Sequence, residues 1–427
     1  MCRAHFAGLV YISTFIALKT FIMPGFELFG DEERKEVNEV LNTGILMRYG
    51  FDGPRKGIWK SRELEAALCR RLGSGYAQLT SSGTSALTTA LAALGIGAGD
   101  EVIMPTFTFV ASFEAVLSVG ASPVLADIDE TLTINPESAA KHINHRTKCL
   151  MPVHMCGSMA ELDQLIEIST RHNLVLLEDA CQSIGASYKG KSLGTIGHAG
   201  CLSFDFVKTI TCAEGGAVLT HSHEIYQKCD GYSDHGHDHA GTDRGADLHP
   251  FLGYNFRISE LHAAVGLAQL RKLDQFLAIQ KKNHQRLREI LSQVTEISFR
   301  KIPDPTGDTF TFLSWFLPSE ELTQALMNEL KEQGIAAGNF YWYDHNWHYI
   351  RKWDHLKNAI SLSNLSGPQM HALEKISKTN FQASDRIMSR CISTSIGLLW
   401  TEDQLEEKGK KLVAAVKKIL SRQSVSI

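Results

Sequence analysis

Residues 76–87, YAQLTSSGTSAL, contain a strand pattern, a turn with one glycine and the start of an apolar helix. YAQLT is typical of a β-strand, and the helix is expected to run on from Ala86. Gly83 permits close approach of the backbone. The amides freed at the helix start, together with the hydroxyls of Thr84 and Ser85, would form a cradle for an anion. An ordinary helix N-cap would use the same residue types. The order of strand, turn and helix indicates an α/β protein.

Short apolar runs continue to alternate with helical patterns up to about residue 220. Because strands separated by helices form parallel sheets, we expect a doubly wound, mostly parallel sheet with helices on both faces. Ligands of such sheets bind at the carboxyl ends of the strands, so the polar residues that follow each run are the candidates for function. The expected strands are residues 76–80, 101–104, 123–126, 149–154, 174–178, 201–205 and 217–220.

The domain organisation is predicted from a long helical pattern between Ile258 and about Glu289, which is suited to link two domains. We expect a large domain at residues 23–285 and a smaller α+β domain at residues 286–427. Residues 1–22 have a basic start and a short apolar core, and we interpret them as an extension upstream of a start at Met23. A signal peptide is the alternative, and the apolar run is too short to predict a membrane span.

The composition excludes several classes of protein. The chain has 427 residues, of which 44% are hydrophobic, and a formal net charge of −4. This balance predicts neither nucleic-acid binding nor membrane binding. The nine cysteines form no CxxC pair, which favours reduced thiols in a cytoplasmic enzyme over a disulfide framework or a zinc ribbon.

Three further residues suggest a particular chemistry. Phe109 follows a strand end and would either pack in the core or stack on a planar ring. Asp179 ends an apolar strand, where a carboxylate needs a cationic partner, either a protonated ring nitrogen or a structural salt bridge. Lys208 lies between Val207 and Ile210, and its amine would be a nucleophile if apolar surroundings disfavour the charged form. An exposed turn lysine is the commoner alternative.

The sequence resembles the fold-type I enzymes that use pyridoxal 5′-phosphate (PLP), and more narrowly the DegT-like sugar aminotransferases. The resemblance covers most of residues 79–270. It rests on the motifs SSGTSAL, GDEVIMPTFTFVAS, EDACQSIGASYKGKSLGTIG, SFDFVKTITCAEGGAV and LGYNFRISELHAAVGLAQL. It implies a large PLP-binding domain, a smaller C-terminal domain and a homodimer with shared active sites.

The resemblance also implies roles for individual residues. Lys208 matches the lysine that attaches to the cofactor aldehyde, and Asp179 matches the partner of the pyridine nitrogen. Phe109 matches the ring-stacking position, and Gln182 the residue near the phenolic oxygen. The implied phosphate ligands are Thr84, Ser85 and Ser203, with Asn255 reaching over from the partner subunit. Relatives that dehydrate sugars carry histidine at the position of Lys208, so the lysine favours transamination.

The expected substrates are glutamate as donor and a keto or aldehyde sugar as acceptor. Segments such as VHMCGSMA and SDHGHDHAGTDRGADLHP resemble members that aminate C8 of the acid sugar 3-deoxy-octulosonate, and a nucleotide-linked keto sugar is the alternative. A sugar acid needs a cationic or donor-rich pocket for its carboxylate. The candidate substrate residues are His154, His235, His237, Arg244 and His348.

The segment at residues 233–239, SDHGHDH, also permits a different hypothesis. His235, His237, His239 and Asp238 would serve as metal ligands of a hydrolase if the alternate histidines shared one face of an extended segment. That hypothesis leaves Lys208 and Asp179 without a role. We therefore expect no metal site and interpret the histidines as residues near the mouth of the pocket.

Overall fold

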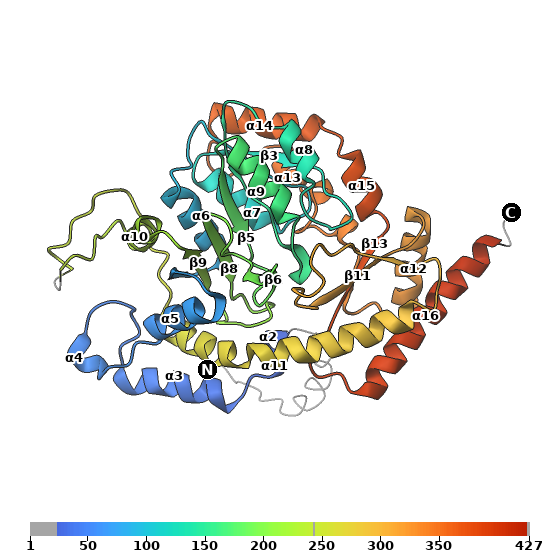
Figure 1. The fold of residues 1–427 in the computed structure, drawn as a ribbon, viewed down its shortest axis with the longest axis horizontal. Coiled ribbons are helices and arrows are strands. Elements are labelled where there is room, and N and C mark those ends of the chain that lie inside the picture. The colour runs from blue at the N-terminus through green and yellow to red at the C-terminus, as the bar shows by residue number, and fades with distance from the viewer. Residues whose placement is uncertain (1–23, 242–243, 425–427) are drawn as a thin grey trace, which may run out of the picture.

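The computed structural model describes residues 24–241 and 244–424, so the expected extension at residues 1–22 lies outside the described residues. A seven-stranded sheet lies inside the larger part of the molecule (Figure 1). Its strand order is β1-β9-β8-β5-β4-β2-β3, parallel from β8 to β3, with β9 antiparallel to both of its neighbours. The strands are β1 (Tyr76–Thr80), β2 (Glu101–Pro105), β3 (Ser122–Ala126), β4 (Thr147–Leu150), β5 (Val175–Asp179), β8 (Ala199–Ser203) and β9 (Gly216–Thr220).

The sequence predicted each of these seven strands, and β8 lies two residues earlier than the expected 201–205. β4 ends at Leu150 rather than at residue 154, because Pro152 has no amide hydrogen for the ladder and the chain turns into the 3-10 helix η2 (Met155–Gly157). β9 runs antiparallel to β8 and forms a hairpin with it, in which Ser203 pairs with Gly216. The turn that contains Lys208 therefore begins and ends at one edge of the sheet.

Helices cover both faces of this sheet, as expected for strands that are buried along most of their length. The helix after β1 is held by a capping box, in which the hydroxyls of Ser82 and Ser85 each accept the backbone N–H of the other residue, at 3.0 and 2.9 Å. The helices around the sheet are α5 (Lys60–Leu72), α6 (Gly83–Ala93), α7 (Val110–Ser118), α8 (Pro136–Lys141), α9 (Leu162–Arg171) and α10 (His223–Tyr232).

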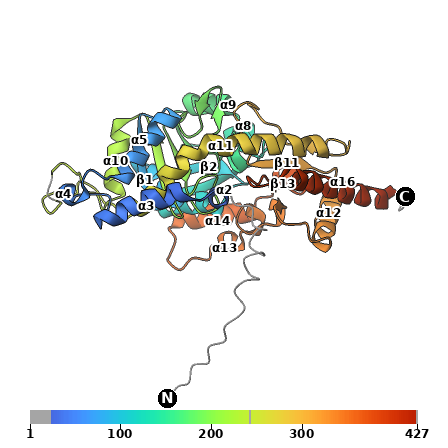
Figure 2. The same cartoon turned by 90° about the horizontal axis from the view of Figure 1, so that it is seen from below.

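The long helix α11 (Glu260–Leu291) runs along the molecule from the large sheet to the C-terminal part (Figure 2). Its apolar side packs against α5, and α3 (Asp31–Thr43) lies beside it. The sequence predicted this helix within two residues at each end. It continues without a break through residue 285, and the domain boundary at that position stays a prediction.

The C-terminal part contains an antiparallel sheet with strand order β10-β11-β13-β12, covered by α12 (Glu320–Glu332) and α16 (Glu402–Ser424). Its strands are β10 (Ser298–Phe299), β11 (Phe312–Phe316), β12 (Asn339–Phe340) and β13 (Cys391–Ser395). The remaining elements are α2 (Pro24–Glu27), α4 (Asp52–Arg55), α13 (Asp354–Lys357), α14 (Gly367–Lys378), α15 (Gln382–Met388), β6 (Ser187–Tyr188), β7 (Lys191–Ser192), η3 (Trp342–Asp344) and η4 (Ile350–Lys352).

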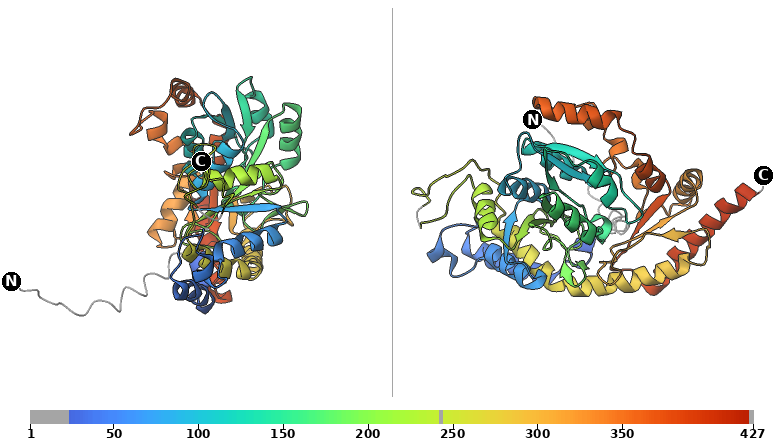
Figure 3. Two further views of the ribbon diagram at one scale, coloured as in Figure 1. Left: turned by 90° about the vertical axis from the view of Figure 1, so that its left-hand side faces the viewer. Right: turned by 45° about the horizontal axis from the view of Figure 1, so that its top comes forward.

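Part of the C-terminal chain returns to the large sheet. α14 packs against β3, above the strands in Figure 1 and at the top of both views in Figure 3. Trp342, Tyr349 and Trp353 belong to the same apolar cluster as Leu87 and Phe113 of the large part. The two parts of the molecule therefore share a core. Among the described residues, no helix combines the length and the apolarity that a membrane crossing requires.

Candidate active site

The carboxyl edge of the large sheet brings the predicted site residues together. Asp179, the last residue of β5, pairs in register with Cys201 of β8, two residues before Ser203. Thr80, the last residue of β1, pairs with Gly216, at the far end of the lysine turn. The ends of β1, β5 and β8 thus meet at one edge, as the doubly wound sheet predicts.

Lys208 is half-buried in the turn between β8 and β9. Its backbone N–H donates to the carbonyl of Asp205 at 3.0 Å, and its carbonyl accepts the N–H of Gly25 at 3.1 Å. The expected apolar surroundings are present on one side only, because Ile210 is buried whereas Val207 is 45% exposed. The turn is anchored at both ends and leaves the lysine side chain accessible.

Asp179 is buried, with 2% of its surface exposed, and its carboxylate is held by two donors. The Ser112 hydroxyl donates to Oδ2 at 2.6 Å, and the Cys181 backbone N–H donates to Oδ1 at 3.1 Å. The Thr108 hydroxyl lies 2.6 Å from that of Ser112 and extends the network. Within residues 24–241 and 244–424 Asp179 forms no ion pair. The structural salt bridge, which was the alternative to a protonated ring nitrogen as partner of Asp179, is therefore not present among these residues. A buried acid held in this way is suited to a cationic ligand.

The anion cradle at the start of α6 is packed closely against β8. A Cβ atom added to Gly83 would lie 2.7 Å from Cβ of Ser203 and 3.2 Å from Sγ of Cys181. Thr84 is exposed, whereas Ser85 is buried and its hydroxyl takes part in the capping box. The start of α6 therefore lies in contact with the end of β8 and with the residues that follow Asp179.

Phe109 and His348 form an aromatic contact after the end of β2. Phe109 is 37% exposed, and its ring centroid is 5.3 Å from that of His348. The positive charge of Lys208 contributes to a lowered pKa of His348, after burial and the neighbouring His345. The same charge acts on Cys181, whose pKa is raised mainly by burial. Lys208 thus lies within electrostatic reach of Cys181 on one side and His348 on the other.

His154 and Gln182 stabilise the chain around the site. His154 is fully buried; its Nδ1 accepts the N–H of Ala160 at 3.2 Å, and its Nε2–H donates to Glu178 at 3.0 Å. This geometry favours a structural role for His154 over contact with a substrate. The side-chain oxygen of Gln182 accepts the N–H of Cys156 at 3.0 Å, and the amide group of Gln182 is half-buried.

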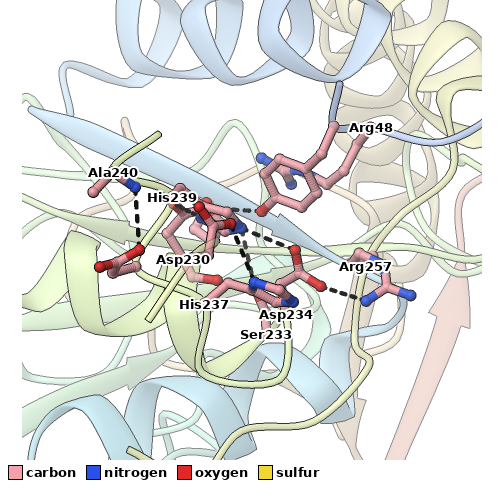
Figure 4. Close-up of polar contacts among 12 residues, drawn as sticks. Arg48, Asp230, Ser233, Asp234, His237, His239, Ala240 and Arg257 are labelled. Atoms are coloured by element: carbon pink, nitrogen blue, oxygen red, sulfur yellow. Dashed lines mark hydrogen bonds and ion pairs between the residues drawn. The ribbon is translucent and has the colours of Figure 1, made fainter. Parts of the chain in front are cut away.

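The segment SDHGHDH forms part of an ionic cluster, which we call the Asp234 cluster (Figure 4). The ring of His239 bonds through Nδ1 to Asp230 at 2.7 Å and through Nε2 to Asp234 at 2.9 Å. Burial lowers the pKa of His239, but the two carboxylates outweigh it and raise the pKa to about 9. Arg244 contacts Asp234 through both of its terminal nitrogens, at 2.6 and 3.1 Å, and Arg257 also pairs with this carboxylate.

The other candidate residues of this loop, His237, His235 and Asn255, form no hydrogen bond or ion pair with Asp234 through their side chains. His237 bonds to Asp247 at 3.2 Å, and His235 is exposed, with a positive φ of 58°. Asn255 is exposed on the same loop, which projects from the left of the molecule in Figure 1. Its neighbour Phe256 accepts the N–H of Ser81 through its carbonyl at 2.7 Å, so the end of the loop lies beside the anion cradle. Within the described residues, no group of three or more histidine, cysteine, aspartate or glutamate side chains is arranged to hold a metal ion.

The comparisons with known proteins agree with this geometry. Residues 28–408 match the DegT/DnrJ/EryC1/StrS aminotransferase family. The chain belongs to this family of aminotransferases. The match includes the lysine turn, the Asp179 site and the anion cradle, and it replaces the metal-hydrolase hypothesis. Members of the family are PLP-dependent sugar aminotransferases, as the motifs predicted.

Solved structures of other proteins have a fold similar to that of this chain. The structure of 3-amino-5-hydroxybenzoic acid synthase is 28% identical, covers 93% of this chain and 99% of its own, and has a TM-score of 0.77. An aminotransferase from Psychrobacter cryohalolentis is 27% identical, covers 94% of this chain and 99% of its own, and has a TM-score of 0.78. Helicobacter pylori PseC, an aminotransferase of pseudoaminic acid biosynthesis, is 22% identical, with 93% and 99% coverage and a TM-score of 0.76, and shares the fold.

The residues at the sheet edge fit the family cofactor. When bound, PLP acts as an electron sink that stabilises negative charge on a substrate carbon. Asp179 would face its ring nitrogen, and the α6 start, which packs closely against Ser203, would hold its phosphate. Sequence reasoning missed Ser112 and Thr108, which orient Asp179, because hydroxyls in the PTFTFVAS motif carry no signal that they point at a carboxylate.

Proposed function

We propose that the protein transfers an amino group from glutamate to the C8 carbonyl of 8-oxo-3-deoxy-manno-octulosonate. The product is 8-amino-3,8-dideoxy-manno-octulosonate, an amino form of a lipopolysaccharide sugar, made in the cytoplasm. The reaction type is supported by one observation above all: Lys208 and the ion-pair-free Asp179 both lie within electrostatic reach of Cys181 in a chain of this family. The choice of acceptor is supported by the resemblance of residues around SDHGHDH and by the charge of the Asp234 cluster.

In this proposal the protein side chains hold the cofactor and move one proton. Lys208 would attach to the cofactor aldehyde, and its amine, when free, would carry a proton to and from the substrate carbon. Asp179, held in place by Ser112 and Cys181, would meet the ring nitrogen. Phe109 and Gln182 would contact the ring.

The phosphate and the second subunit complete the proposed site. Thr84, Ser85 and Ser203 would bind the phosphate from one subunit, and Asn255 of the projecting loop would reach the site of the other. Asn255 is exposed in the isolated chain, as such a role requires. We therefore propose a homodimer with two shared sites.

The Asp234 cluster offers charge for the carboxylate of a sugar acid. His239, Arg244 and Arg257 supply three positive charges, and Asp230, Asp234 and the nearby Asp247 supply three carboxylates. Arg244 remains partly exposed, so part of its guanidinium is open to a further anion. We propose that Arg244, with His235, His237 and His348 as further contacts, binds the acceptor, and that His154 acts only through packing.

The acceptor is tested by pairing glutamate with 8-oxo-3-deoxy-manno-octulosonate and, separately, with a nucleotide-linked 4-keto hexose. Amination of the octulosonate, detected by mass spectrometry, supports the proposal. Amination of the nucleotide sugar alone would refute the choice of acceptor and leave the aminotransferase assignment standing. Lys208→Ala should abolish turnover with glutamate while the cofactor still binds, and Lys191→Ala, at an exposed lysine, should leave it unchanged. Transamination that survives Lys208→Ala would refute the mechanism.

A further inference from the structure

The side chain of Gln182 is held by a turn that follows a different strand of the sheet. Its Oε1 accepts the backbone N–H of Cys156, in η2 after β4, at 3.0 Å. Because this bond engages the oxygen, the NH₂ group is the end of the amide that is left for a ligand. Nε2 forms no hydrogen bond with the described residues, and Gln182 is partly exposed. The side chain is therefore fixed as a hydrogen-bond donor three residues after Asp179.

The η2 turn has a backbone conformation that most residues rarely adopt. Cys156, its middle residue, has φ 57° and ψ 36°, and Gly157 has φ 78°. A left-handed conformation is unfavourable for a residue with a side chain and persists only where the surroundings hold it. The direction of the Cys156 N–H, and with it the bond to Gln182, depends on this conformation.

Two residues of the C-terminal part bond to the turn on both sides of Cys156. Arg300 follows β10 and is buried, and its Nη1 donates to the carbonyl of Met155 at 2.8 Å. Thr309 donates to the carbonyl of Gly157 from its backbone N–H at 3.1 Å and from its hydroxyl at 2.9 Å. A Cβ atom added to Gly157 would lie 2.0 Å from that hydroxyl. The C-terminal part therefore packs directly against the turn and bonds its backbone.

The buried guanidinium of Arg300 forms no ion pair among the described residues. Its Nε donates to the carbonyl of Thr131 at 2.6 Å, so the side chain connects this carbonyl to that of Met155. Nη2 is buried without a hydrogen-bond partner in the described chain. The titratable groups that act on Arg300 are Cys156, Asp308, Cys391 and Asp129. Since buried charges are normally paired, the bonds to two carbonyls explain this arginine better than charge pairing does.

We propose that Arg300 and Thr309 are positioning residues that hold the η2 turn, so that Cys156 keeps the NH₂ group of Gln182 toward the phenolic oxygen of the cofactor. Their effect passes through Gln182 and needs no contact of either residue with the cofactor. A donor at that oxygen stabilises its negative charge, so the proton that the oxygen shares is released at a lower pH. The inference rests on the proposed role of Gln182 and is independent of which sugar is the acceptor.

The test follows the visible absorbance of the bound cofactor as the pH is raised, without any substrate. In Gln182→Leu the midpoint of the absorbance change should rise by about one pH unit or more, as expected for losing a hydrogen bond to a charged oxygen. Arg300→Lys keeps the positive charge but offers one nitrogen in place of the two that bond carbonyls. Thr309→Val removes the hydroxyl. Each should raise the midpoint by about half a unit, because the donor is loosened rather than removed. Arg386→Lys, at an exposed arginine of α15, is the control and should leave the midpoint unchanged.

Combined variants decide whether the effect passes through Gln182. In the Gln182→Leu background neither Arg300→Lys nor Thr309→Val should add a further shift, because the group through which they act is gone. Either substitution is sufficient for this comparison if the other does not fold. Shifts that add in full would refute the positioning role, since a general change of charge or stability acts in both backgrounds. A midpoint that neither substitution moves while Gln182 is present would refute it as well. A midpoint unchanged in Gln182→Leu would instead refute the proposed contact of Gln182 with the cofactor, and the inference with it.

Discussion

Replacing Glu178 by glutamine should destabilise the protein although the change removes no atom from the core. Glu178 is fully buried beside Asp179. Its Oε1 accepts the backbone N–H groups of Ile196 and Gly197, both at 2.7 Å. Its Oε2 accepts the N–H of Gly194 at 2.9 Å and Nε2–H of His154 at 3.0 Å. Burial raises the pKa of Glu178, but these donors outweigh it and the pKa lies below its ordinary value.

The magnitude follows from the number of donors that lose an acceptor. Either orientation of the glutamine places its NH₂ group against two N–H donors of the protein. An unsatisfied buried donor costs about 1–3 kcal/mol, so the substitution should cost about 2–6 kcal/mol. For a chain of this length the unfolding entropy is roughly 0.9 kcal/mol per degree, which converts the loss into a fall of about 2–7 °C in Tm.

Thermal unfolding followed by circular dichroism, at one protein concentration and at pH 7.5, measures this fall. Glu114→Gln is the matched control, because Glu114 is exposed on α7 and its charge has no comparable set of donors. We expect the control to unfold within about 1 °C of the parent. A Glu178→Gln protein that also unfolds within about 1 °C would refute the ionised, fully bonded carboxylate.

Two further predictions concern the Asp234 cluster and the anion cradle. Because His239 binds its proton more tightly in the folded protein, with a pKa of about 9 against 6.5 when unfolded, its contribution to stability is complete below about pH 6.5 and is lost as the pH rises through 9. Tm measured from pH 6 to 9.5 should therefore fall more steeply in the parent than in His239→Gln, and parallel curves would contradict the ion pairing. Gly83→Ala, whose Cβ would lie 2.7 Å from Cβ of Ser203, should lower cofactor affinity at least about tenfold by absorbance titration, as expected for misplacing the helix start by a few tenths of an ångström. Gly53→Ala, with open space around the added carbon, should bind normally, and normal binding by both variants would contradict the close packing of the cradle.

The fold was predictable to the extent that its signals are local. Short apolar runs separated by glycine and proline located the strands, and an uninterrupted helical period located α11. The hairpin of β8 and β9 was predictable because the short connection around Lys208 leaves no room for a helical crossover. The return of α14 to β3 was missed, because an amphipathic helix does not specify which sheet it covers.

Candidate site residues could be predicted where the role of a residue follows from its type and its sequence neighbours. They could not be predicted where the role depends on a contact with a distant segment. Lys208 and Asp179 were proposed from their own neighbours in the sequence. The partner of His154 is a glutamate 24 residues later, and Arg244 meets Asp234 together with Arg257. These contacts form between segments that carry no matching pattern, so the sequence showed polar residues without showing which of them are already paired.

The shared apolar core has a consequence for the order in which the chain folds during synthesis. The cluster that covers β2 and β3 is complete only when Trp353 and the residues of α14 have been added. The ribosome makes every strand of the large sheet long before it makes these residues. The apolar side chains on one face of the sheet therefore stay exposed to solvent while the C-terminal part is translated. We expect nascent chains that stop before residue 340 to bind chaperones and aggregate, even though they contain all of the proposed cofactor ligands.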